Sequence, residues 1–174
     1  MRLRAAGPAD ADAIADLHTA SWRDAYRAAL RADWLADHAA ADRRALWRAR
    51  LGESPAARRV LLAHEASGAL AGFVCVQPGA DAHWGALLDN LHVAERCRRQ
   101  GIGRALMEAA ARVCQAETPG AGLFLWVLRD NLRAQAFYRA LGASDAGSDL
   151  WDAPDGSRVP ICRFAWTALP EPHR

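Results

Sequence analysis

Residues 87–104 read Leu-Leu-Asp-Asn-Leu-His-Val-Ala-Glu-Arg-Cys-Arg-Arg-Gln-Gly-Ile-Gly-Arg, and this stretch decides the fold. An apolar run ends in a short basic loop with two glycines, and the loop opens into a helix-forming segment from Arg104 to Glu117. Such a strand, loop and helix predict an anion site, because free backbone N–H groups and the positive end of the helix dipole point the same way. Positive side chains are unfavourable at a helix N-terminus. We therefore expect a multiply charged anion to balance the arginines gathered there: Arg96, Arg98, Arg99 and Arg104.

The spacing of this loop, Arg98-x-x-Gly101-x-Gly103, excludes two familiar phosphate motifs. A Walker loop ends in Gly-Lys-Ser/Thr, and this chain has no lysine. A dinucleotide fingerprint needs three glycines in the pattern G-x-G-x-x-G. A nucleotide enzyme with a phosphate loop is therefore a poor alternative.

Length and composition predict one globular domain, which we place at residues 1–169 with a short tail at 170–174. The 174 residues are 52% hydrophobic and include seven tryptophans, enough for a sizeable core. The net charge of +2 favours no nucleic-acid partner. Four scattered cysteines form no C-x-x-C pair, so we expect neither a metal site nor a disulfide framework. We also expect no membrane span and a cytoplasmic location.

Periodicity and turn residues predict a mixed α/β order of strand, two helices, three strands, helix, strand, helix and two strands. The first helix opens near Pro8 and Asp10. Pro78–Gly85 reads as a loop, Pro154-Asp155-Gly156 as a turn. The remaining expected elements are strands at Arg2–Ala5, Val60–His64, Leu70–Gln77, Ala86–Val93, Leu123–Leu128, about Ser144–Trp151 and about Arg158–Leu169, and a second helical region at about Asp33–Arg50.

A second motif occupies residues 131–142, Asn-Leu-Arg-Ala-Gln-Ala-Phe-Tyr-Arg-Ala-Leu-Gly. Asn131 can cap a helix whose apolar face holds Phe137 and Tyr138, and Gly142 ends that helix. On these grounds alone, Tyr138 reads as a buried tyrosine with a satisfied hydroxyl.

Together the two motifs resemble the GCN5-related N-acetyltransferase (GNAT) family. Its coenzyme A loop is written Arg/Gln-x-x-Gly-x-Gly/Ala, and its second motif Asn-x-x-Ala-x-x-Phe-Tyr-x-x-x-Gly is complete here. The resemblance covers most of the chain and is most specific at 87–142. It implies a central, mostly antiparallel twisted sheet of six to seven strands, flanked by about four helices and splayed at the strand that ends near residue 93.

The resemblance also implies where acetyl-CoA binds. A bulge in the strand that ends near residue 93 frees backbone groups for the pantetheine arm, and backbone amides of the loop cradle the pyrophosphate. The residues expected to bind the cofactor are Leu91, His92, Val93, Arg98, Arg99, Gln100, Gly101, Ile102, Gly103, Arg104, Asn131, Ala134 and Phe137.

In this family a tyrosine at the position of Tyr138 protonates the departing thiolate. A proton transfer from a tyrosine to a thiolate is uphill by only roughly 2 kcal/mol on reference pKa values. Family members often carry a base two residues before the bulge, and here that residue is Asp89. The alternative role for this carboxylate is hydrogen bonding to a neighbouring loop. We place Asp89 on the strand face of Leu91 and His92 on the opposite face. His83 reads as solvated.

Cys97 raises the possibility of an acyl-cysteine intermediate, since flanking arginines lower a thiol pKa. The family transfers directly in a ternary complex, so we expect Cys97 to be structural.

The expected reaction partner is a small-molecule or peptide amine, which we place among Trp22, Tyr26, Asp89, Trp126 and the 152–157 turn. A homodimer is possible. One alternative is a coenzyme A-binding regulatory module without turnover, in which Tyr138 is dispensable. Another is an acetyltransferase acting on aminoacyl-tRNA, which needs a basic stripe such as Arg43, Arg44, Arg48 and Arg50, although a solvated helix face explains these arginines as well.

Overall fold

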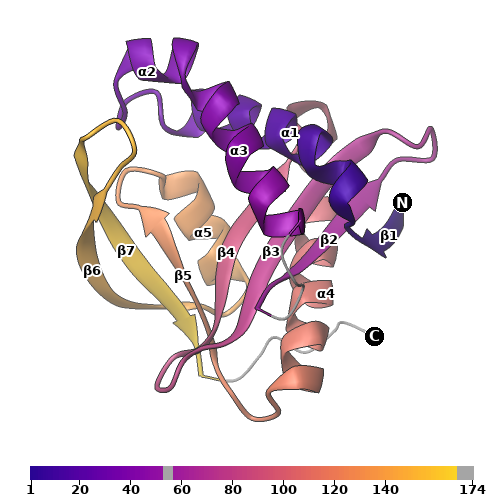
Figure 1. The fold of residues 1–174 in the computed structure, drawn as a ribbon. Helices are drawn as coiled ribbons and strands as arrows, with labels where there is room; N and C mark the ends of the chain where they lie inside the picture. The colour runs from indigo at the N-terminus through magenta and orange to yellow at the C-terminus, as the bar shows by residue number, and fades with distance from the viewer. Residues whose placement is uncertain (53–56, 168–174) are drawn as a thin grey trace.

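A seven-stranded twisted sheet forms the centre of the protein in a computed structural model that describes residues 1–52 and 57–167 (Figure 1). The strand order is β1-β2-β3-β4-β5-β7-β6. Neighbouring strands are antiparallel except β4 and β5, which run parallel. The strands are β1 (Arg2–Ala5), β2 (Arg59–His64), β3 (Leu70–Asp81), β4 (Gly85–Val93), β5 (Leu123–Leu128), β6 (Ser144–Asp152) and β7 (Arg158–Trp166).

Helices cover both faces of this sheet. On one face, α1 (Ala11–Ala25) and α3 (Ala39–Gly52) pack with β2 and β3 around Ile14, Trp47 and Phe73, and the short α2 (Ala32–Asp37) adds Leu35 beside Leu128. On the other face lie α4 (Ile102–Glu117) and α5 (Leu132–Ala140). Two short 3₁₀ turns, Pro8–Asp10 and Glu95–Cys97, precede α1 and the loop before α4.

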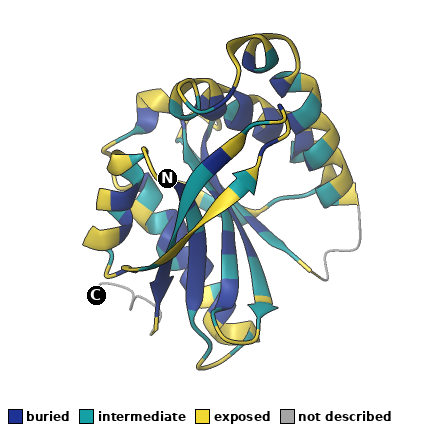
Figure 2. Ribbon diagram, turned by 90° about the vertical axis from the view of Figure 1, so that its left-hand side faces the viewer, coloured by how far each residue is buried: buried dark blue, intermediate teal, exposed yellow. Residues whose placement is uncertain are grey.

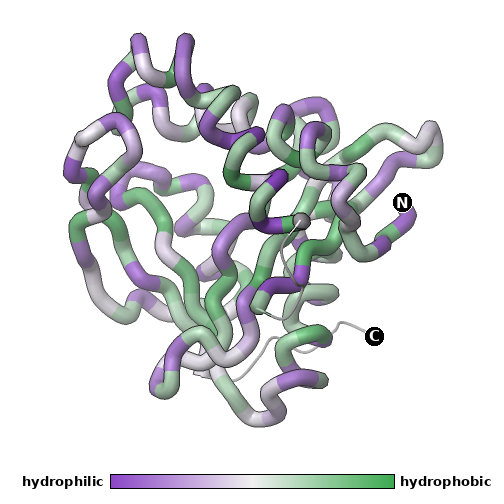
Figure 3. Tube along the Cα trace, viewed as in Figure 1, coloured by the Kyte–Doolittle hydropathy of each residue, from purple (hydrophilic) through white to green (hydrophobic). Residues whose placement is uncertain are grey.

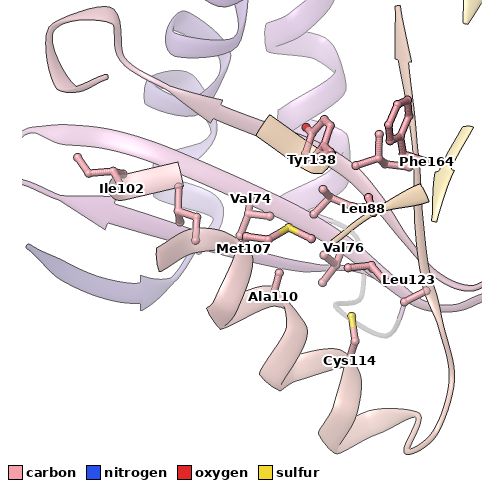
Figure 4. Close-up of a cluster of buried hydrophobic side chains, with 14 of the residues drawn as sticks. Val74, Val76, Leu88, Ile102, Met107, Ala110, Cys114, Leu123, Tyr138 and Phe164 are labelled. Carbon is pink, nitrogen blue, oxygen red and sulfur yellow. The ribbon is translucent and has the colours of Figure 1, made fainter. Parts of the chain in front are cut away.

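The main core lies between the sheet and the pair α4 and α5. Leu106, Met107 and Ala110 of α4 are buried against Val74, Val76 and Leu88, and Tyr138 of α5 completes the cluster beside Phe164 (Figure 4). Figure 2 shows buried residues along the central strands and exposed residues on the outer sides of the helices. Hydropathy follows the same division in Figure 3, with hydrophobic residues concentrated on the inner strands.

The predicted sheet with its splayed strand is confirmed, and most elements lie within two residues of their expected bounds. The predicted loop at Pro78–Gly85 is wrong, because β3 continues to Asp81 and pairs with Gly85 to form a tight hairpin. Strand pairing there overrides the preference of Pro78 and Gly79 for a loop. The register shift between Gln77 and Asp81 accommodates the proline and the glycine.

The helical region expected at about Asp33–Arg50 is two helices, separated at His38. The separation gives five α-helices among the described residues instead of about four. The last strand, expected to reach Leu169, ends at Trp166. Residues 168–169 and the predicted tail at 170–174 lie outside the described residues. None of the helices within residues 1–52 and 57–167 has the length and apolar character to cross a membrane.

Candidate active site

The parallel strands β4 and β5 pair at one end only. Ala86 pairs with Leu123 and Leu87 with Phe124, and no pairing follows within the described residues. β5 stays paired with β7 as far as Leu128. At the joined end, Gly122 must be a glycine, because a Cβ there would lie 2.9 Å from the carbonyl oxygen of Trp166. From Leu88 onward, the edge of β4 that faces β5 therefore presents free backbone groups to a cleft in the sheet.

A bulge at Asp89 decides where the side chains of β4 point. Cys75 of β3 pairs with Asn90 and the next residue, Val76, pairs with Leu88, so Asp89 is the extra residue. An inserted residue shifts the alternation of side chains by one position. Asp89 therefore points to the α1–α3 side, where its Oδ2 lies 2.7 Å from Nη1 of Arg50, whereas Leu91 packs into the core beside α4.

Two predictions about strand faces are consequently wrong, and so is the position of the bulge, which was expected two residues beyond Asp89. Asp89 does not share a face with Leu91, and His92 is not opposite to Asp89. The ring of His92 lies 4.5 Å from that of His18 and 5.2 Å from that of Phe73, both on the α1–α3 side. Simple alternation of side chains failed to predict these directions because Asp89 is the extra residue of the bulge.

Burial sets the protonation of His92. It lowers the pKa of His92 to about 4, with the positive charges of Arg43 and Arg98 as smaller causes. The imidazole is therefore neutral near pH 7.

The loop between β4 and α4 presents its backbone amides outward. Arg99 and Gly101 both adopt left-handed conformations, with φ of 62° and 79°. The amides of Arg99, Gln100 and Gly101 donate to no group among the described residues. The first-turn amides of α4, from Ile102 to Arg104, lack helical acceptors by their position. This series of free donors could bind an anion, as the spacing of the loop predicts.

The arginines of this loop divide into held and free groups. Arg96 binds Glu65 at 2.7 Å and the carbonyl of Leu70, and Nη2 of Arg98 binds Asp24 of α1 at 2.8 Å. Arg99 and Arg104 are exposed and make no ion pair with any described residue. Arg99 and Arg104 could therefore bind a phosphate without breaking an existing contact. Arg98 would first have to share or break its ion pair with Asp24.

Cys97 carries a protonated thiol. Its Sγ donates to Oε1 of Glu65 at 3.3 Å. Burial and then the carboxylate of Glu65 raise the pKa of the thiol, and the opposing charge of Arg96 is the weaker cause. The idea that flanking arginines lower this pKa is wrong, which leaves Cys97 a poor nucleophile.

The second motif closes the cleft from the α5 side. Asn131 caps α5, and its Oδ1 accepts from the amide of Ala134 at 3.1 Å. Gln135 donates to the carbonyls of Leu128 and Arg129, which holds the helix against the end of β5. A Cβ on Gly103 would meet the ring of Phe137 at 3.4 Å. The glycine therefore brings the start of α4 close to α5.

Tyr138 is a buried tyrosine without a protein partner for its hydroxyl. The ring packs against Phe137 and Trp166 at centroid distances of 5.3 and 6.1 Å. No hydrogen bond to its hydroxyl is formed within residues 1–52 and 57–167. Burial raises the pKa of Tyr138, so the group is protonated near neutral pH. The satisfied hydroxyl expected of a purely structural tyrosine is therefore not found among these residues.

The α1–α3 side of the cleft is an aromatic and basic face, which we call the acceptor face. It comprises Trp22, Tyr26, Arg43, Arg50, Trp84, Asp89, Trp126, Trp151 and Arg163. Tyr26 stacks on Trp22 at 4.9 Å and meets Trp151 edge-on at 5.9 Å. Burial raises the pKa of Tyr26 to about 12. Trp22 is only 5% exposed, so mainly Tyr26 and Trp151 carry this part of the face.

Trp126, the third predicted acceptor residue, lies on β5 away from that aromatic group. Its neighbours Leu125 and Val127 point into the core beside α4, so Trp126 points to the α1–α3 side. Arg163 of β7 is its cross-strand partner, and the guanidinium lies 4.4 Å from the ring of Trp126. Sequence reasoning missed Arg163, Trp84 and Arg50, because no local pattern connects them to the motifs.

The basic stripe proposed for RNA binding is compensated by carboxylates. Arg44 binds Asp16, Arg48 binds Asp12 and Arg50 binds Asp89, each at 2.7–2.9 Å. Arg43 pairs with Asp42. These four arginines therefore leave little unbalanced charge for a polyanion.

Comparisons with known proteins agree with this arrangement. The family model described as "Acetyltransferase (GNAT) family" matches residues 13–143, three quarters of the chain. The protein therefore belongs to the GNAT acetyltransferase family, and it is an acyltransferase of the N-acetyltransferase type. Among curated protein sequences, no significant match is found.

Several solved structures share the fold. The PaiA N-acetyltransferase of Thermoplasma acidophilum, solved in complex with coenzyme A, is 19% identical with a TM-score of 0.71, covering 95% of this chain and 98% of that one. A GCN5-related N-acetyltransferase from Rhodopseudomonas palustris is 21% identical with a TM-score of 0.74, over 94% and 93% of the two chains. A nourseothricin acetyltransferase is 31% identical with a TM-score of 0.55, over 62% and 64%.

Proposed function

We propose that this protein transfers the acetyl group of acetyl-CoA to a primary amine by direct attack in a ternary complex. The observation that carries the proposal is the cleft between β4 and β5, which opens beyond Leu87 and leads to a loop of unpaired amides. A cleft edged by free backbone groups suits an arm rich in amides, and the loop suits a pyrophosphate.

The donor would lie along the edge of β4. Backbone groups of Leu91, His92 and Val93 would pair with the pantetheine arm as a strand would. The amides from Arg99 to Arg104 would surround the pyrophosphate, with the free guanidinium groups of Arg99 and Arg104 beside it. Asn131, Ala134 and Phe137 support this site by holding the start of α5 against the start of α4.

The amine must lose a proton before it attacks, since alkyl amines are protonated at neutral pH. Asp89 and His92 are the titratable candidates on the acceptor side of β4. The ion pair with Arg50 uses Oδ2 of Asp89, and no described residue bonds to Oδ1, which leaves that oxygen for a water. His92, with a pKa of about 4, is no stronger a base than a carboxylate. We assign Asp89 the base role, acting through water, because its negative charge also attracts the positively charged amine.

Tyr138 would protonate the leaving thiolate. Its raised pKa keeps the proton on the phenol until it is needed. A thiolate that forms in the same apolar surroundings is also destabilised, so burial raises both pKa values and the transfer stays accessible. The unpaired hydroxyl supports this role over that of a structural tyrosine.

Calorimetry tests the donor first, with acetyl-CoA, coenzyme A and ATP compared on the same protein. We expect micromolar binding of acetyl-CoA and coenzyme A and none of ATP. Thiol release with an amine panel then tests turnover. Absence of acetyl-CoA binding would overturn the proposal, and binding without turnover for any amine would favour the regulatory module.

A further inference from the structure

The acceptor face contains a guanidinium that lies over two indole rings. The Cζ atom of Arg163 lies 4.7 Å from the ring centroid of Trp84 and 4.4 Å from that of Trp126. Trp84 comes from the β3–β4 hairpin, whereas Trp126 and Arg163 are paired residues of β5 and β7. Contact with two rings restricts the movement of a guanidinium and leaves its N–H edges for ligands.

No carboxylate among the described residues forms an ion pair with Arg163. Its Nε is buried without a hydrogen-bond partner, and its guanidinium makes no ion pair with any residue in 1–52 or 57–167. The positive charge of Arg163 is a minor cause of the lowered pKa of Asp81. The Oδ1 atom of Asp81 accepts hydrogen bonds from the backbone amides of His83 and Trp84. A cation that no described carboxylate balances favours an anionic ligand, which would bind at the Nη edge because the buried Nε is out of reach.

The surrounding charges fix the sign of that ligand. Arg50 is matched by Asp89, and Arg43 by Asp42. Arg163 is therefore the excess charge on this face, among the residues that the structure describes. A single planar fork fits a carboxylate in two parallel hydrogen bonds, whereas a phosphate dianion calls for further cations that are absent from these described neighbours.

Arg163 also lies close to the place where β4 and β5 separate. Trp126 follows Phe124, the last β5 residue to pair with β4, by two positions and points to the same side as Asp89. Trp126 thus borders the cleft, and Arg163 lies directly behind it on β7. Trp84, Trp126 and Arg163 are all half-buried, so their outer edges remain accessible.

We propose that Arg163 anchors a carboxylate of the acceptor, so that the substrate is an amine that also carries a carboxylate, such as an amino acid or a peptide. This inference rests on the proposed acetyl transfer. Arg163 acts as a specificity residue: it binds the carboxylate, and the amine extends across Trp126 toward Asp89 and the cleft.

The experiment compares amines that differ only by the carboxylate. Glycine, β-alanine and lysine are paired with methylamine, ethylamine and cadaverine, and kcat/KM is measured by thiol release at saturating acetyl-CoA. We expect at least about a tenfold preference for the carboxylated member in one or more pairs. Equal or better use of the carboxylate-free amines would overturn the inference.

Variants separate recognition from folding. Arg163→Gln should raise KM for the carboxylated amine about tenfold or more, and leave the carboxylate-free amine and the affinity for acetyl-CoA unchanged. Arg163→Lys keeps the charge and should restore only part of the preference, because it lacks the planar fork. The matched control is Arg158→Gln on the same strand, where the exposed arginine pairs with Asp152 at 3.2 Å. Equal loss with both amines would make Arg163 merely structural and overturn the inference.

One further experiment needs no variant. Short carboxylates without an amine, acetate and propionate, should inhibit the wild-type enzyme competitively with the amine and not with acetyl-CoA. Absence of such inhibition counts against the anchor even if Arg163→Gln fails to fold. Failure of the proposed function is visible separately as absent acetyl-CoA binding. Acetylation of carboxylate-free amines but of no carboxylated amine would overturn the anchor alone.

Discussion

The two sides of the cleft are built in different ways for the ligands that we propose. On the donor side, one continuous segment from β4 through the loop into α4 presents backbone amides, and glycines shape it. On the acceptor face, single side chains come from α1, α3, β5, β6, β7 and a hairpin. A site made of backbone groups depends on local conformation and tolerates many side chains, whereas a site made of side chains depends on which distant segments the fold brings together.

The largest effect should follow from a change to the donor loop. Gly101→Glu places an unfavourable side chain at a φ of 79° and a negative charge among the free amides. We expect acetyl-CoA affinity to fall at least about 100-fold by calorimetry, because repulsion replaces charge-assisted hydrogen bonds.

Gly68→Glu is the matched control for that change. Gly68 has a φ of 88° and, like Gly101, open space around its Cβ position, but it lies in the β2–β3 turn away from the cleft. The control should share the backbone strain and keep full affinity. Unchanged binding in Gly101→Glu would remove the loop from the donor site.

Tyr138→Phe tests the chemistry where the two sides meet. Loss of the proton donor should lower kcat about 100-fold, near the lower end for general acid catalysis, since a thiolate is already a fair leaving group. Acetyl-CoA affinity should stay the same in calorimetry. The hydroxyl has no partner among the described residues, so thermal stability should hardly change. Full turnover of the variant would end the assignment of Tyr138 as the acid.

Acid should destabilise the fold through two buried histidines on the acceptor side. Burial lowers the pKa of His92 to about 4 and that of His18 well below its usual value, so the unfolded chain binds more protons than the folded one below about pH 6.5. Stability therefore falls as pH falls through this window, by roughly 2 kcal/mol between pH 7 and pH 5 from His92. Urea unfolding at both pH values measures the loss.

His92→Phe removes one of these titrations. The variant keeps a ring beside Phe73, so the difference in unfolding free energy between pH 7 and pH 5 should shrink. An unchanged difference would mean that His92 is not buried in its neutral form.

The smallest expected effect belongs to Asp89. Asp89→Asn should lower kcat severalfold, most strongly at low pH, where little of the amine is already neutral. A pH–rate profile measures this effect.

Arg50→Gln is the informative partner of that variant, because it breaks the same 2.7 Å ion pair and leaves the carboxylate in place. Activity lost in Asp89→Asn but kept in Arg50→Gln supports the base role. Equal losses in both variants would instead show that the pair only holds α3 to β4.

The motifs at 87–104 and 131–142 predicted the strand, the loop, the helix cap and the sheet around them, because these features follow from local conformational preferences. The bulge at Asp89 was not readable in the same way. It arises from pairing with β3, and its one-residue shift puts Asp89 on the same face as His92 and opposite to Leu91. The ion pairs of Arg50 and Arg98 and the hydrogen bond of Cys97 to Glu65 were hidden for the same reason, since each joins segments distant in the chain.

The sequence by itself determined the family, the donor loop with its glycines and the helix that presents Tyr138. Glycine spacing, caps and apolar periodicity act over a few residues and do not depend on the rest of the chain. Only the tertiary structure decided which way Asp89 and His92 point, and that Trp84, Trp126 and Arg163 stack together. Those relations depend on strand register and on contacts between distant segments, which local preferences cannot specify.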